Sequence, residues 1–235
     1  EFKNDLIGLT THDLRNPISA ISGYLTLVLD GAEADVLNQD QKRFLERSKG
    51  ACEKMLRLIG DVLDVTLIEN GRLKLKKQKV NLSGFLNEVY QEHKCFAQAR
   101  GVALVLDLPV DLPDVEMDPE RISQVLHHLL TNAVRFSEKE TSIRLTASAE
   151  ESKVRISVED HGKGIPEREF SKLFQFFSRT STMPSDGESN SGLGLAIVKK
   201  LVQMHQGTVR VESRVSQGSV FSFSIPLKTG LPETS

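Results

Sequence analysis

Residues 14–28 read LRNPISAISGYLTLV, and the spacing of their apolar residues decides the fold of the N-terminal region. Leucine, isoleucine or valine recurs at intervals of four, three, four and three residues, at Leu14, Ile18, Ile21, Leu25 and Val28. This heptad spacing is typical of a helix that packs along one seam. A second seam with the same spacing follows at Leu45, Ser48, Cys52, Met55, Ile59, Val62 and Thr66.

The polar stretch of residues 31–40 separates the two seams. The sequence therefore predicts two helices of about 25–30 residues, joined as an antiparallel hairpin. One hairpin leaves half of each seam open, whereas two hairpins bury both seams in a four-helix bundle. We therefore expect a homodimer. The alternative is a hairpin that packs against the second half of its own chain.

The pattern changes from Gly71 onward, where strands and helices are mixed. Period-two alternation predicts half-buried strands at residues 143–147, 154–158, 209–211 and 221–225, and residues 102–108 form another expected strand. Helices are expected at residues 83–99 and 192–204, and from Asp118-Pro119-Glu120 to about Arg135, since Asp caps a helix and Pro suits its first position. This mixture predicts an α/β sandwich, a mixed sheet with helices on one face.

The whole chain is thus expected to be an α+β multidomain protein. The expected boundaries are a dimerisation hairpin at residues 1–72, a linker at 73–80, an α/β domain at 81–228 and a tail at 229–235.

Composition excludes several classes of protein. The 235 residues include 30 Lys+Arg and 32 Asp+Glu, so the net charge of −2 excludes a polycation that binds nucleic acid by bulk electrostatics. Two cysteines suit a reducing compartment, and no apolar run is long enough for a membrane span. We expect a cytoplasmic fragment without nucleic-acid or membrane contacts. Because it starts inside a predicted helix, we expect a catalytic core from a longer protein, which can itself carry a membrane anchor.

The first candidate for chemistry is His12. It lies about 100° from the seam on the helix surface, where a neutral imidazole is a fair nucleophile near pH 7. Asp13 can accept a ring proton, and Asn16 lies one turn further on the same face. Pro17 is expected to bend the helix there. The alternative is a surface histidine beside a tolerated kink.

Two glycine motifs follow in the second region. Asp160-His161-Gly162-Lys163-Gly164-Ile165 ends a predicted strand; its glycines permit close approach of a ligand, and Asp160 can bind an exocyclic amine such as that of adenine. Ser191-Gly192-Leu193-Gly194-Leu195 opens a predicted helix, whose N-terminus suits phosphate. Residues 178–191 between them are expected to be a disordered loop or a lid. Each motif alone is also typical of a plain turn.

The third candidate is the end of the Asp118-capped helix. Asn132 offers a carbonyl oxygen to a hard cation such as Mg²⁺, and Arg135 can reach a phosphate. The alternative is a structural asparagine near a helix end.

In this order, the motifs resemble those of a sensor histidine kinase catalytic core. His12 to Pro17 resembles the phosphoacceptor box, Asn132 to Phe136 the Mg-ATP-binding asparagine box, and Asp160-x-Gly162-x-Gly164 the adenine-binding glycine box. Phe174, Phe177 and Arg179 resemble the phenylalanine box, and Gly192-x-Gly194-Leu195 the glycine box of the lid. The terminal hairpin, with Gly218-Ser219-x-Phe221, is also similar.

The resemblance implies a dimeric phosphoacceptor hairpin of the HisKA type and an ATP-binding domain of the GHKL superfamily. It implies transfer of the γ-phosphoryl group of ATP to His12, then to an aspartate of a response regulator receiver domain, and it allows phosphatase activity toward that regulator. The implied cofactors are ATP and Mg²⁺. The implied catalytic residues are His12, Asp13 and Asn16; Asn132 is the implied metal ligand. The implied nucleotide-binding residues are Asn132, Arg135, Phe136, Asp160, Gly162, Gly164, Ile165, Phe177, Arg179, Gly192, Leu193, Gly194 and Leu195.

Three residues depart from the family pattern. Asp13 replaces the usual Glu, His128 replaces an Asn, and Asn190 replaces a Gly. Asn tolerates a left-handed backbone better than most residues, so the turn at Asn190 can survive. These departures keep open a catalytically weak, ATP-binding dimeric scaffold, or pseudokinase. A GHKL ATPase is disfavoured because the catalytic Glu of that class is absent from position 128.

Overall fold

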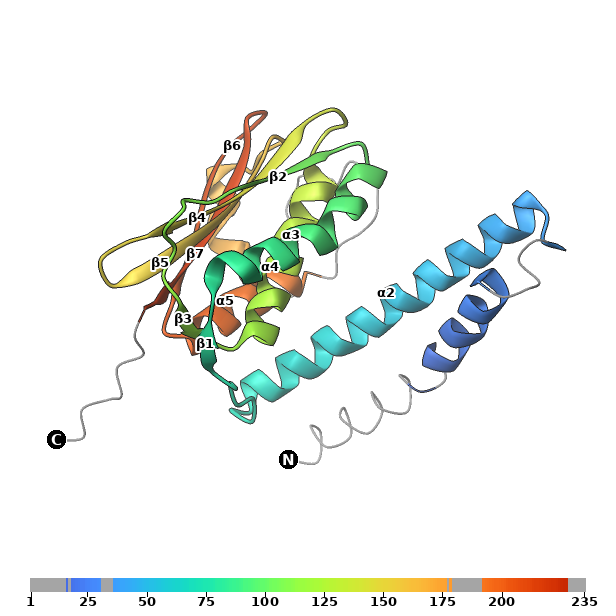
Figure 1. Ribbon diagram of the computed structural model, residues 1–235, viewed down its shortest axis with the longest axis horizontal. Helices are drawn as coiled ribbons and strands as arrows, with labels where there is room; N and C mark the ends of the chain where they lie inside the picture. The colour runs from blue at the N-terminus through green and yellow to red at the C-terminus, as the bar shows by residue number, and fades with distance from the viewer. Residues whose placement is uncertain (1–15, 17, 31–35, 177, 179–191, 228–235) are drawn as a thin grey trace. The chain divides into compact units, whose positions relative to one another are not determined.

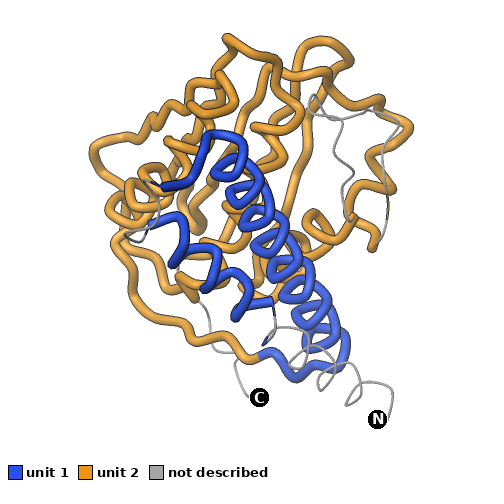
Figure 2. The backbone as a smooth tube through the Cα atoms, turned by 90° about the vertical axis from the view of Figure 1, so that its right-hand side faces the viewer, with its two compact units in different colours: residues 1–73 blue, residues 74–235 orange. Residues whose placement is uncertain are grey.

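The computed structural model describes residues 16, 18–30, 36–176, 178 and 192–227, and the chain divides into two compact units. Unit 1 comprises residues 1–73 and unit 2 residues 74–235 (Figure 2). The sequence predicts a linker at residues 73–80. Residues 78–80 of this stretch instead form a strand of unit 2.

The described residues of unit 1 form two long helices. Residues 18–30 are helical, and α2 runs from Gln39 to Glu69 (Figure 1). Asn38 begins α2 because its side chain accepts from the Gln41 amide while the Gln41 side chain accepts from the Asn38 amide, both at 2.9 Å. The two helices lie side by side in both views, which confirms the predicted hairpin (Figures 1 and 2).

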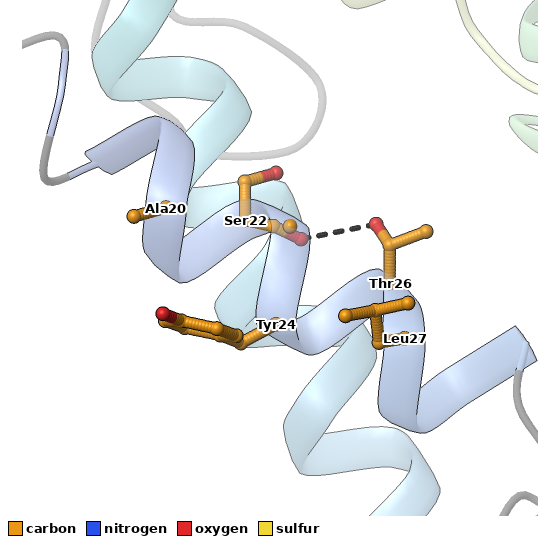
Figure 3. Close-up of a pocket in the computed structure, with 6 residues that line it drawn as sticks. Ala20, Ser22, Tyr24, Thr26 and Leu27 are labelled. Carbon is orange, nitrogen blue, oxygen red and sulfur yellow. Dashed lines mark hydrogen bonds between the residues drawn. The ribbon is translucent and has the colours of Figure 1, made fainter.

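The described residues of both predicted seams are only partly buried in a single chain. In α2, Cys52 is buried, whereas Met55 is 42% exposed and Val62 39%. In the helix of residues 18–30, Ile21 is 49% exposed. A residue set on another face, Ala20, Ser22, Gly23, Tyr24, Thr26 and Leu27, lines a shallow hollow (Figure 3). Both helices, where the structure describes them, therefore present exposed apolar side chains.

Unit 2 is built on a five-stranded mixed sheet. The strands β2 (Ala103–Asp107), β4 (Ser142–Ala149), β5 (Lys153–Asp160), β7 (Gly218–Pro226) and β6 (Thr208–Arg214) lie in the spatial order β2-β4-β5-β7-β6. The β2–β4 pair is parallel and the other three pairs are antiparallel. A separate two-stranded sheet pairs β1 (Gln78–Val80) with β3 (Val115–Met117).

Three helices cover one face of the large sheet: α3 (Leu82–Ala99), α4 (Pro119–Phe136) and α5 (Gly194–Met204) (Figure 1). The short 3-10 helix η2 spans Glu167–Lys172. Strand registers such as Leu145↔Val158 and Ile156↔Phe223 align apolar residues on the face that the helices cover. The predicted sandwich with helices on one face is confirmed.

Asp118 begins α4 as the sequence predicts. Its Oδ1 atom accepts from the Arg121 amide at 3.2 Å, and Pro119 occupies the start of the helix. Its Oδ2 atom accepts from the Lys76 amide at 2.7 Å, so the same carboxylate ties the chain that enters unit 2 to α4. None of the helices described here is both long and apolar enough to cross a bilayer.

Candidate functional site

Direct contacts bring three of the sequence motifs together in unit 2. Ser137, the residue that ends α4, forms an isolated bridge with Gly162 in the loop after β5. A Cβ at Gly162 would overlap the carbonyl group of Phe136. About two turns earlier on α4, His128 lies against Gly194 at the start of α5. The asparagine motif thus lies between the two glycine motifs.

The carboxylate of Asp160 is the buried polar centre of this region. Asp160 is 5% exposed, and its Oδ1 atom accepts from the Gly162 amide at 2.9 Å. The amide of Ser219 on β7 also donates to the carboxylate. Burial raises the pKa of Asp160 to about 6, although the two backbone donors act in the opposite direction. The group is therefore mostly ionised at neutral pH and can accept a hydrogen bond from a ligand amine.

The loop after Asp160 needs glycine where other backbone passes close by. Gly164 has φ of +67°, and a Cβ there would overlap the carbonyl of Arg214 on β6. The next amide, that of Ile165, donates to Ser213 Oγ at 2.8 Å. The β6–β7 hairpin therefore holds the loop in place.

The start of α5 carries the positive end of a helix dipole, which favours an anion. Gly192 has φ of +74°, and the N-cap residue Leu193 has no polar side-chain atom with which to cap the helix. Among the described residues, no side chain caps this 11-residue helix. Leu193 is buried, and Gly194 and Leu195 are half-buried.

The side chain of His128 lies between α4 and α5. Its Nδ1 atom is 3.0 Å from the position of a Cβ at Gly194. Burial, followed by the neighbouring His127, lowers the pKa of His128 to about 4, so it is neutral at pH 7. Asn132 follows one turn later on α4 and is half-buried, as are Arg135 and Phe136.

Two known protein families match this chain, one in each of its two units. Residues 117–229 match the family described as "Histidine kinase-, DNA gyrase B-, and HSP90-like ATPase". Residues 2–71 match "His Kinase A (phospho-acceptor) domain". Both domains therefore occur in one chain, in the order that the motifs predict. The chain belongs to the histidine kinase family.

Individual histidine kinases match about two thirds of the chain or more. "Circadian input-output histidine kinase CikA" of Synechococcus elongatus is 33% identical over 229 residues, which are 97% of this chain and 30% of the relative. The crystal structure of full-length ShkA in complex with AMPPNP has a TM-score of 0.76 at 27% identity, covering 97% of this chain and 47% of that one. The catalytic domain of the histidine kinase ThkA has a TM-score of 0.57 at 30% identity, covering 66% of this chain and all of that one. The chain thus spans less than a third of the length of CikA.

Several predicted site residues of this histidine kinase lie outside the described residues: His12, Asp13, Phe177, Arg179 and all of the predicted lid except Ser178. Asn16 is described; it is helical and exposed. No group of three or more His, Cys, Asp or Glu side chains suited to a metal occurs in the part of the chain that the structure describes.

Sequence reasoning missed two groups of residues at this site. Ser213 and Ser219 hold the loop after β5, but a serine in an alternating strand gives no signal of its own. The Nε2 atom of His93 on α3 lies at hydrogen-bond distance, 3.1 Å, from the Nδ1 atom of His127. The Nδ1 atom of His93 lies 2.8 Å from the Val89 carbonyl oxygen, and because a carbonyl only accepts, Nδ1 donates there. These helices are distant in sequence, so spacing could not reveal that pair.

Proposed function

We propose that this chain transfers the γ-phosphoryl group of ATP to His12 and then to an aspartate of a response regulator receiver domain. The observation that carries the proposal is the buried Asp160 carboxylate, held by backbone amides in a glycine loop beside the asparagine motif. The two family matches supply the phosphoacceptor domain and the ATPase-type domain.

ATP would bind with its base at Asp160 and its phosphates toward α5. The ionised carboxylate accepts a hydrogen bond from the 6-amino group of adenine, and a guanine would present an acceptor oxygen to the same carboxylate. The amides at Gly192 and Gly194 lie at the N-terminus of α5, where phosphate is favoured. Arg135 and Arg179 are the proposed cationic side chains for the phosphates.

The donor chemistry at the end of α4 fits Mg²⁺. Asn132 offers a hard amide oxygen, and Mg²⁺ in nucleotide sites commonly takes one or two protein ligands together with phosphate oxygens and water. Asn132 is therefore the proposed ligand. When bound, Mg²⁺ would neutralise charge on the phosphates, and the chain's own residues would bind and orient the nucleotide.

The chemical step joins His12 to the γ-phosphoryl group. A ring nitrogen of His12 forms the bond to phosphorus as the bond from phosphorus to the bridging oxygen breaks and ADP leaves. Asp13 takes or orients the proton on the other ring nitrogen. The phosphoryl group then passes to a regulator aspartate. Asn16, exposed four residues after His12, is the proposed residue that positions water if the protein also dephosphorylates the regulator.

We further propose that two hairpins form a four-helix bundle. The partly exposed seam residues Ile21, Met55 and Val62 support a homodimer, because a single chain leaves them in contact with water. We assign the reaction to the cytoplasm, since ATP is the substrate and the two thiols suit a reducing compartment.

Incubation with γ-labelled ATP tests the proposal. The wild type should acquire acid-labile, base-stable label, and His12→Gln should acquire none. Arg47→Gln on α2, which changes an exposed side chain outside the proposed site, is the control and should be labelled like the wild type. Label on His12→Gln would overturn the assignment. Nucleotide binding without any label in the wild type would favour the pseudokinase, for which the departure at His128 is the specific observation.

A further inference from the structure

The hydroxyl group of Ser213 has a full set of hydrogen bonds at the end of β6. It lies 2.8 Å from the carbonyl oxygen of Gly218, 2.9 Å from Ser219 Oγ and 2.8 Å from the Ile165 amide. Because a hydroxyl donates once and accepts twice, Ser213 donates to Gly218 and accepts from the Ser219 hydroxyl and the Ile165 amide. No hydrogen-bonding capacity of this side chain is left over.

These three bonds join the two arms that hold Asp160. One arm is the loop that begins at Asp160 and reaches Ile165. The other is the hairpin residue Ser219, which lies opposite both Asp160 and Ser213 in the sheet register and whose amide donates to the Asp160 carboxylate. Ser213 therefore connects both ends of the arrangement, although its own side chain is not bonded to Asp160.

Neighbouring backbone contacts show how little room this arrangement has. Gly218 has φ of +93°, and a Cβ there would overlap the carbonyl of Asp160. A Cβ at Gly164 would overlap the carbonyl of Arg214. The Ser216 amide also donates to the Lys163 carbonyl at 2.8 Å. With the loop and the hairpin in direct contact, a small displacement of one changes the position of the other.

We infer that Ser213 is a positioning residue for adenine recognition, which sets the preference of the site for adenine over guanine nucleotides by holding the Asp160 carboxylate in place. This inference rests on the proposed binding of adenine at Asp160. A correctly placed carboxylate accepts from the 6-amino group of adenine and opposes the 6-oxo group of guanine. If the carboxylate shifts, ATP loses that hydrogen bond, whereas GTP has none to lose.

The test is equilibrium binding of Mg-ATP and Mg-GTP to the full chain by competition against a fluorescent ADP analogue. Ser213→Ala should raise the Kd of ATP about fivefold and leave that of GTP within about twofold, so that the ATP preference falls about fivefold. Ser213→Thr keeps the hydroxyl and should restore the preference. Hydrogen exchange should show a faster Ile165 amide in Ser213→Ala.

Ser224→Ala is the matched control. Ser224 is a buried serine on β7, and its hydroxyl lies 2.8 Å from the Thr208 hydroxyl, in the same sheet but bonded to neither the loop nor Asp160. It should leave both Kd values within about twofold of the wild type. A purely structural role for Ser213 would weaken ATP and GTP binding equally.

Two kinds of failure are distinguishable. An unchanged ATP-to-GTP preference in Ser213→Ala, with Asp160→Asn still weakening ATP binding, would overturn this inference alone. A wild type that does not prefer ATP, or an Asp160→Asn variant that binds ATP normally, would overturn the proposed adenine site and this inference with it. If Ser213→Ala does not fold, as judged by circular dichroism, Ser213→Cys replaces it under the same criterion.

Discussion

His128 on α4 and Gly194 on α5 are in contact: the Nδ1 atom of the imidazole lies 3.0 Å from the position that a Cβ at residue 194 would take. Asn132 follows His128 by one helical turn, and Gly194 is the first residue of α5. The contact therefore links the α4 helix that carries the proposed metal ligand to the proposed phosphate-binding end of α5. Because the imidazole of His128 lies this close, residue 194 is sensitive to the size of its side chain.

The first prediction concerns this pair. Gly194→Ala should lower stability by about 1 kcal/mol in the wild type, because His128 must move to admit the methyl group. In a His128→Asn background the same change should be neutral or stabilising by about 0.5 kcal/mol, since alanine favours a helix over glycine. Thermal unfolding of the four proteins measures the coupling. Equal effects of Gly194→Ala in both backgrounds would show that the contact has no energetic weight.

The second prediction concerns pH. Burial raises the pKa of Asp160 to about 6, so the carboxylate is ionised above this pH and gains a proton below it. ATP affinity should decrease about tenfold as the pH falls through 6, because the bond to the adenine amine loses its charged acceptor. The phosphates of ATP titrate in the same range, with a pKa of about 6, so Asp160→Asn is the comparison. Only the phosphate contribution should remain in that variant, and an identical pH profile would contradict the assignment.

The third prediction compares a glycine in crowded surroundings, Gly162, with one in open surroundings, Gly50. Gly162→Ala should destabilise unit 2 by about 3 kcal/mol or more and abolish nucleotide binding, since its Cβ would overlap the Phe136 carbonyl at the end of α4. Gly50→Ala in α2 meets no atom within 4 Å and should stabilise by about 1 kcal/mol through helix propensity. Calorimetry of both variants provides the check. A tolerated Gly162→Ala would mean that the loop is not held against α4.

The fourth prediction concerns Asp118, which joins three segments of unit 2. Its carboxylate accepts from the amides of Arg121 and Lys76, and its own amide donates to His205 Nε2 at 3.1 Å. Asp118→Ala should cost about 2–3 kcal/mol, because both amides lose their acceptor while the amide of residue 118 keeps its partner. Asp118→Asn retains one oxygen acceptor and should cost less than half as much. Chemical unfolding separates the two, and an equal loss would show that a single remaining oxygen cannot replace the carboxylate.

Local sequence patterns predicted some elements of the fold and not others. The α4 boundary was predictable because Asp118-Pro119 acts within one helical turn. Strands β4, β5, β6 and β7 were predictable because their apolar residues alternate. The β1–β3 pair was not, since each strand has only three residues and their partners lie more than 30 positions apart. The sequence pattern therefore assigns residues 78–80 to the linker, whereas the structure places them in β1.

Some features of the candidate site were likewise visible in the sequence, and others only in the structure. The residue types at Asn132, Asp160, Gly162 and Gly194 were recognisable from their motifs, and the structure brings those motifs into contact. The contact of His128 with Gly194 was not visible, because it joins helices 66 positions apart in the sequence. Roles that fall on His12, Asp13, Phe177 and Arg179 remain predictions from the sequence.

The sequence alone determined the helical hairpin, the alternating strands, the glycine positions and the order of the motifs, because periodicity, caps and backbone freedom act over a few neighbouring residues. Only the tertiary structure decided the strand order β2-β4-β5-β7-β6, the second backbone donor to Asp160 and the three bonds of Ser213. Those features depend on which distant segments pack together. Such pairing is set by burial of the whole apolar face, and no local pattern encodes it.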